Sequence, residues 1–216
     1  MSIFYSADKD EAMRAAYMSS KSTHQGEEAA ECCRLLAYLC TTAIQLGVQE
    51  ATTKKFLINI SESFTSPLYS VQCLASSQQE KKHLENESIG ASCFHAGLQD
   101  RNWNWRDSRY RYSPSRSKFQ PGYVGSYAMD ALAMSLHCVY STSSFEAAVL
   151  KAANMRGDAD TVAAITGQLA GSIYGAKSIP KSWITKVQSW DGKGRIAYTA
   201  FCLYKKRYSD LDLPAV

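Results

Sequence analysis

Residues 156–175 read RGDADTVAAITGQLAGSIYG, a small and apolar run that opens with two carboxylates and a hydroxyl. The run predicts a helix over 161–174, because small residues recur at helical spacing along it. These residues are Ala163, Ala164, Gly167, Ala170, Gly171 and Gly175. Glycine inside a helix costs about 1 kcal/mol relative to alanine. So many glycines therefore predict that the backbone of a neighbouring element approaches this helix closely.

Helical periodicity continues on both sides of this stretch. Apolar residues at three- and four-residue spacings predict further helices over 8–20, 27–46, 51–64, 126–140, 144–154, 181–190 and 195–208. We expect residues 76–87 to form a polar helix or a loop. Residues 100–123 lack a clean period and contain Pro114 and Pro121, so we expect a long surface loop whose Trp residues anchor it to the core. The predicted fold is all-α.

The composition limits the classes of protein that fit. The length of 216 residues suits a single domain over 1–216, and a net charge of +4 is too small to indicate nucleic-acid binding. No apolar run reaches the roughly 20 residues that span a membrane, and the N-terminus does not resemble a signal peptide. The seven cysteines form no C-x-x-C pair, which favours core thiols in an intracellular, cytoplasmic protein.

The start of the helix at 161–174 carries the candidate chemistry. Gly157 permits a sharp turn, and Asp158, Asp160 and Thr161 follow it. One aspartate at this place is explained by helix capping. Two carboxylates and a hydroxyl exceed what a cap needs, and oxygen ligands without thiol or imidazole suit magnesium or manganese. The spacing alone leaves the cap and the metal site equally open.

Several segments together carry a resemblance to a known family. The run GDADT followed by a small-residue helix ending in Tyr-Gly resembles the C-terminal signature of the ADP-ribosylglycohydrolase family. Residues 22–26, STHQG, resemble the family's T-H-G turn before a long helix, and residues 121–126, PGYVGS, resemble its G-Y-V turn. Residues 143–154, SSFEAAVLKAAN, resemble the helix before the metal signature, and 179–183, IPKSW, the segment after it. The resemblance covers nearly the whole chain.

This resemblance implies a compact all-α domain with two magnesium ions that hydrolyses ADP-ribosyl conjugates at the anomeric carbon of the ribose. It implies that Asp158, Asp160 and Thr161 are metal ligands, and that the two aspartates are catalytic. It further implies that ADP-ribose, alone or on a modified protein, contacts a set of ligand-binding residues: His24, Gly122, Tyr123, Gly125 and Ser126. The expected partners include no nucleic acid and no membrane.

One feature of the family is absent from this sequence. Family members carry a T-D-D motif near the N-terminus that supplies further metal ligands, and this chain contains no adjacent pair of aspartates. We therefore expect that the chain lacks the N-terminal third of the domain and binds one ion, or binds its ions weakly. Three explanations stay open: a fragment, a complementing N-terminal segment from a partner, or a non-catalytic homologue that binds ADP-ribose weakly or is structural.

Overall fold

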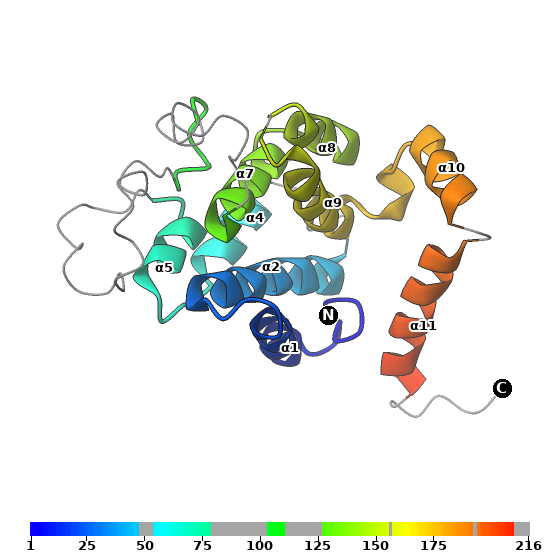
Figure 1. Ribbon diagram of the computed structural model, residues 1–216, viewed down its shortest axis with the longest axis horizontal. Coiled ribbons are helices and arrows are strands. Elements are labelled where there is room, and N and C mark those ends of the chain that lie inside the picture. The colour runs from blue at the N-terminus through cyan, green and yellow to red at the C-terminus, as the bar shows by residue number, and fades with distance from the viewer. Residues whose placement is uncertain (48–53, 79–102, 111–126, 156, 192–193, 210–216) are drawn as a thin grey trace.

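The computed structural model describes residues 1–47, 54–78, 103–110, 127–155, 157–191 and 194–209. Every regular element in these residues is a helix, which confirms the all-α prediction (Figure 1). The helices are α1 Lys9–Lys21, α2 Glu27–Leu46, α4 Lys54–Glu62, α5 Tyr69–Ala75, α7 Ala128–Tyr140, α8 Phe145–Ala153, α9 Ala159–Tyr174, α10 Lys181–Trp190 and α11 Arg195–Ser209, with a short 3₁₀ helix, η3, at Ala176–Ser178. Helix α5 was not predicted, because seven residues are too few to display a period.

Local capping explains where several helices begin and end. The carboxylate of Asp8 accepts a hydrogen bond of 3.0 Å from the backbone N–H of Glu11 at the start of α1. The hydroxyl of Ser144 does the same for α8, at 3.1 Å from the N–H of Ala147. Gly47 and Gly175 end α2 and α9 with φ angles of +77° and +76°, a region that favours glycine.

Helix α7 forms the centre of the core. All of its side chains from Met129 to Val139 are buried, so it is covered on every side. Figure 1 shows α2 crossing the middle of the molecule with α1 below it and α7, α8 and α9 above it. A helix that is apolar all round is stable in water only when its neighbours cover it. Helix α7 therefore fixes the arrangement of the helices around it.

The described part of the predicted loop, 103–110, is anchored by aromatic side chains. Trp103 and Trp105 are 2% and 0% exposed, and the indole N–H of Trp105 donates a hydrogen bond of 2.7 Å to the carbonyl of Leu74. The expected anchoring by tryptophan is confirmed. These residues form a loop, as expected: Ser108 and Arg109 are exposed, and Tyr110 is buried together with the two tryptophans. The rest of 100–123, and residues 79–87, lie outside the described residues.

The close approach predicted for the glycines of α9 is not found. A methyl group built on Gly167 would meet no atom within 4 Å, and one on Gly171 would make an ordinary contact of 3.8 Å with Phe145. Close packing onto the α9 backbone occurs instead through Ser135 of α7, whose hydroxyl lies 3.2 Å from the carbonyl oxygen of Val162. The small residue at the contact thus comes from the neighbouring helix.

The cysteines and the membrane prediction can be checked in the described residues. Cys32, Cys40, Cys73 and Cys138 are buried, as expected of core thiols. Cys33 is half-buried and Cys202 is exposed. Within the described ranges, none of the helices has both the length and the apolar character needed to cross a bilayer.

Candidate active site at the start of helix α9

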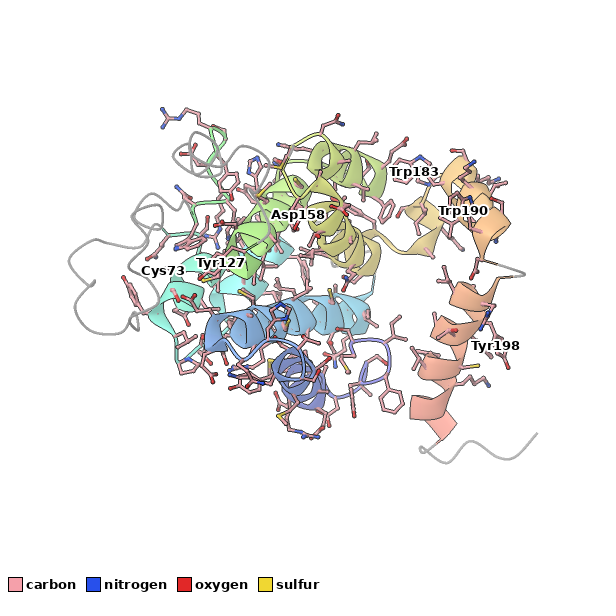
Figure 2. The ribbon with its side chains drawn as sticks, viewed as in Figure 1. Cys73, Tyr127, Asp158, Trp183, Trp190 and Tyr198 are labelled. Carbon is pink, nitrogen blue, oxygen red and sulfur yellow. The ribbon has the colours of Figure 1, made fainter. Side chains whose placement is uncertain are left out.

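Gly157 and Asp158 form the turn that leads into α9. Gly157 has a φ angle of +71°, which a side chain would strain. The helix begins at Ala159, two residues earlier than predicted, so Asp160 and Thr161 lie in its first turn. Both of these side chains are exposed, and that of Asp158 is half-buried. Figure 2 shows Asp158 at this end of the helix.

Helix capping does not account for Asp158. The residue occupies the N-cap position of α9, yet its side chain makes no capping hydrogen bond. The same chain caps α1 with Asp8 in the ordinary way. An aspartate at this position normally accepts a hydrogen bond from the second or third N–H of its helix. Helix capping, the simplest structural explanation, therefore does not account for the Asp158 carboxylate.

The electrostatics of this turn favour the ionised form of Asp160. The backbone N–H of Thr161, followed by the neighbouring Asp158 side chain, lowers the pKa of Asp160 below its ordinary value of 3.8. The first N–H groups of a helix carry partial positive charge and favour an anion there. Asp160 is thus a carboxylate at neutral pH, which is the form that binds a metal ion.

The donors at this turn fit a hard cation, but they are few. Two carboxylates and a hydroxyl are oxygen ligands of the kind that magnesium takes, usually with several waters retained. In the parts of the chain that the structure describes, no group of three or more His, Cys, Asp or Glu side chains could hold a metal ion. An ion at Asp158, Asp160 and Thr161 would therefore need further ligands from elsewhere.

His24 lies in the turn between α1 and α2, and it is exposed. Its backbone N–H donates to the carbonyl of Ser20 at 2.8 Å, and its Nδ1 lies 3.0 Å from the hydroxyl of Thr23. The N-cap of α2 is Gly26, with no side-chain hydrogen bond, so His24 does not cap α2. The turn closes the end of α1 instead, and the His24 side chain faces solvent.

The other predicted ligand-binding residues, Gly122, Tyr123, Gly125 and Ser126, lie outside the described residues. The structure begins again at Tyr127, the N-cap residue of α7. Its hydroxyl donates to a carboxylate oxygen of Glu28 in the first turn of α2, and the hydroxyl of Ser70 donates to the other oxygen at 2.9 Å. Glu28 thereby ties the start of α2 to α5 and α7. The sequence analysis did not predict this role of Glu28, because a glutamate in the first turn of a helix is common and does not by itself indicate a contact.

A second acidic residue was also missed, at the start of α7. Asp130 is 8% exposed, and its charge is the largest contribution after burial to the raised pKa of Tyr110. A single aspartate inside an otherwise apolar helix was the available signal. A buried carboxylate is costly unless it has partners, and Asp130 does interact with another group.

Comparison with known proteins places this arrangement in a family. The sequence model described as ADP-ribosylglycohydrolase matches residues 1–209. The chain belongs to the ADP-ribosylglycohydrolase family. This agrees with the all-α structure and with the segments that carried the resemblance.

Individual family members match shorter segments. The chain is 41% identical over 75 residues, 35% of its length, to the ADP-ribosylarginine hydrolase Tri1 of Serratia proteamaculans (strain 568). It is 46% identical over 61 residues, 28% of its length, to the protein of that name from Pseudomonas putida (strain GB-1). It is 37% identical over 71 residues, 32% of its length, to the ADP-ribosyl-[dinitrogen reductase] glycohydrolase of Rhodospirillum rubrum. The matched segments span 20%, 16% and 24% of these relatives.

Proposed function

We propose that this chain takes part in the magnesium-dependent hydrolysis of ADP-ribosyl conjugates, with Asp158, Asp160 and Thr161 as metal ligands. The observation that carries the proposal is the pair of carboxylates at the start of α9, of which Asp158 occupies a cap position without capping. Membership of the ADP-ribosylglycohydrolase family supports this reading, and so do relatives named for hydrolysis of ADP-ribosylarginine.

The chain's own residues would bind and orient the substrate. Asp158 and Asp160 present carboxyl oxygens at the end of a helix whose N–H groups favour anions. A bound magnesium ion supplies Lewis-acid stabilisation of the charge that develops as the glycosidic bond breaks. His24, together with Gly122, Tyr123, Gly125 and Ser126, would contact ADP-ribose. The substrate class would be a protein that carries ADP-ribose, with arginine-linked ADP-ribose as the first linkage to test.

A second candidate function is a non-catalytic homologue that binds ADP-ribose weakly. It is favoured by the small donor set, since no further cluster of ligating side chains exists in the described ranges. A T-D-D motif is also absent from the sequence. A complementing N-terminal segment from a partner would restore the missing ligands and the first function.

The experiment that separates these functions measures release of ADP-ribose from an arginine-ADP-ribosylated protein, with and without magnesium. We expect magnesium-dependent release by the wild-type chain, and a loss of about 100-fold or more in Asp158→Asn, because a ligand to the catalytic metal is removed. Asp10→Asn, which changes an exposed aspartate in α1, is the matched control and should keep full activity. No release with retained binding of ADP-ribose would favour the non-catalytic function.

A further inference from the structure

Hydrogen bonds from both helices restrict the turn 22–26, which joins α1 to α2 (Figure 1). The ammonium group of Lys21 donates to the carbonyl of Gln25 at 2.7 Å and to the carboxylate of Glu27. The side-chain amide of Gln25 donates in return to the carbonyl of Lys21 at 3.0 Å. The hydroxyl of Tyr17 donates to the second carboxylate oxygen of Glu27 at 2.5 Å. The backbone of the turn is therefore fixed at both of its ends.

Two side chains of this turn are fixed as well. The hydroxyl oxygen of Thr23 lies 3.2 Å from the carbonyl oxygen of Ser20, in the last turn of α1, and 3.0 Å from Nδ1 of His24. The backbone N–H of His24 donates to the same carbonyl at 2.8 Å. Thr23 and His24 are both exposed. Packing in the core therefore does not explain why the ring of His24 is held.

The hydrogens available at these contacts determine which ring nitrogen of His24 is protonated. A threonine hydroxyl has one hydrogen to donate and accepts through its lone pairs. The carbonyl of Ser20 only accepts, so it takes the hydroxyl hydrogen of Thr23. The hydroxyl oxygen then accepts from His24, which places a hydrogen on Nδ1. In the other tautomer the two oxygens, 3.2 Å apart, would face each other without a hydrogen between them.

The second ring nitrogen of His24, Nε2, is then an acceptor. A neutral imidazole has a hydrogen on one nitrogen and a lone pair on the other. Nε2 of His24 has no hydrogen-bond partner among the residues that the structure describes. In the core, His137 has the same arrangement: its Nδ1 donates to a carbonyl, and its Nε2 accepts from Lys151. The lone pair of His24 is instead available to a ligand.

The direction of such a hydrogen bond distinguishes the groups of ADP-ribose. Phosphate oxygens are acceptors and carry negative charge at neutral pH, so they do not donate to a lone pair. The ribose hydroxyls and the adenine amino group are donors. A neutral His24 with its hydrogen on Nδ1 is therefore suited to the hydroxyl and amino groups, and not to the diphosphate.

We propose that Thr23 is a positioning residue that holds His24 as a hydrogen-bond acceptor for a hydroxyl or amino group of ADP-ribose. The inference rests on the proposed function, because it takes ADP-ribose as the ligand. It adds the atom that makes the contact, the direction of the bond and the residue that sets this direction. Which nitrogen of a histidine is protonated depends on the hydrogen bond that the other nitrogen makes. Without the hydroxyl of Thr23, both nitrogens would face water and both tautomers would form.

The protonation of His24 can be measured without a ligand, by long-range ¹H–¹⁵N NMR of the labelled full chain at a pH where histidine is ordinarily neutral. The His24 signals are those that His24→Gln lacks. We expect a hydrogen on Nδ1 in the wild type, a mixture of tautomers in Thr23→Val, and the wild-type spectrum in Thr23→Ser, which keeps the hydroxyl. A hydrogen on Nε2 in the wild type, or an unchanged tautomer in Thr23→Val, would overturn the proposal.

Thr185→Val is the matched control for both measurements. It removes the hydroxyl of an exposed threonine that donates to the carbonyl of Lys181 at 3.0 Å, with no histidine bonded to it. The His24 signals of this variant should equal those of the wild type. Circular dichroism shows whether each variant is folded, which is expected because Thr23 and Thr185 are exposed.

Titration calorimetry with ADP-ribose, in the presence of magnesium, tests the direction of the bond. Thr23→Val should bind about 2- to 10-fold more weakly, the effect of losing one hydrogen bond, and Thr23→Ser should bind like the wild type. If His24 donated to the diphosphate, Thr23→Val would bind equally well or more tightly, since a hydrogen on Nε2 becomes available. That result would overturn the proposal.

Two smaller ligands identify the donor group. Adenosine monophosphate carries the adenine end of ADP-ribose, and ribose 5-phosphate carries the other ribose. The ligand whose binding Thr23→Val weakens contains the group that His24 contacts, and weakening of neither would overturn the contact. A wild-type chain that binds no ADP-ribose would overturn the proposed function together with this contact. An NMR result against Nδ1, with ADP-ribose binding intact, would overturn the present inference alone.

Discussion

At the scale of the single residue, His137 is a buried ionisable side chain with a hydrogen-bond partner at each ring nitrogen. Its Nδ1 donates to the carbonyl of Trp105 at 2.8 Å, and its Nε2 accepts from the ammonium group of Lys151 at 3.0 Å. The ring of Tyr110 stacks on it, with centroids 4.6 Å apart. Burial, and then the charge of Lys151, lower the pKa of His137 below 6.5, against the raising effect of the hydrogen bond to Trp105.

The lowered pKa of His137 predicts a loss of stability in acid. Below pH 6.5 the unfolded chain binds a proton that the folded chain resists, so the free energy of unfolding falls as the pH falls towards the pKa of the folded state. The loss is about 1.4 kcal/mol for each unit by which the pKa is lowered. Urea unfolding between pH 7.5 and 5 measures it. His137→Gln keeps a hydrogen-bond donor and acceptor but does not titrate, so its free energy of unfolding should fall less between pH 7.5 and 5. An equal fall in the variant and the wild type would contradict the role of His137 in this pH dependence.

The candidate site was predictable in part because its signal is local. Asp158, Asp160 and Thr161 lie within four positions, and their place at the start of a helix follows from Gly157 and the small residues after them. The partners of Glu28 could not be predicted. Ser70 is 42 residues away and Tyr127 is 99 residues away, and only the packing of α2 against α5 and α7 brings them together.

At the scale of the element, the two glycines Gly167 and Gly175 of the opening stretch have opposite roles. Gly167 has open space where a side chain would be, so Gly167→Ala should raise the free energy of unfolding by about 0.5–1 kcal/mol through helix propensity. Gly175 has φ of +76° and ψ of +164°, so Gly175→Ala should lower it by about 1–3 kcal/mol. Denaturant melts measure both changes. If Gly167→Ala lowered the free energy of unfolding instead, that result would support the close approach of a neighbouring backbone that the sequence predicted.

The helices were largely predictable because their periodicity depends on near neighbours. The bounds of α10 agree with the sequence prediction, and those of α1 and α8 differ by one residue at each end. The surroundings of each helix were not predictable by the same means. Helices α7 and α11 are both rich in apolar residues, yet α7 is buried throughout and the described side chains of α11 are not. Burial depends on contacts between distant segments, which periodicity does not contain.

At the scale of the whole molecule, the proposed ligand site requires segments that are far apart in sequence. His24 lies at the end of α1, whereas Asp158 and Asp160 lie at the start of α9. Helices α2 and α7 lie between these segments in the chain, pack together, and are joined by the Glu28–Tyr127 hydrogen bond. The matched relatives extend well beyond the segments they share with this chain. Whether the chain itself binds ADP-ribose is therefore the first question to test, before hydrolysis.

The most direct test is isothermal titration of the 216-residue chain with ADP-ribose, with and without magnesium, for the wild type and Asp160→Ala. We predict binding that requires magnesium and that Asp160→Ala abolishes, because the carboxylate contributes to the metal site. Asp10→Ala should bind like the wild type. The absence of heat at millimolar ligand from a folded chain, or binding that is indifferent to both magnesium and Asp160, would contradict the proposed site at the start of α9.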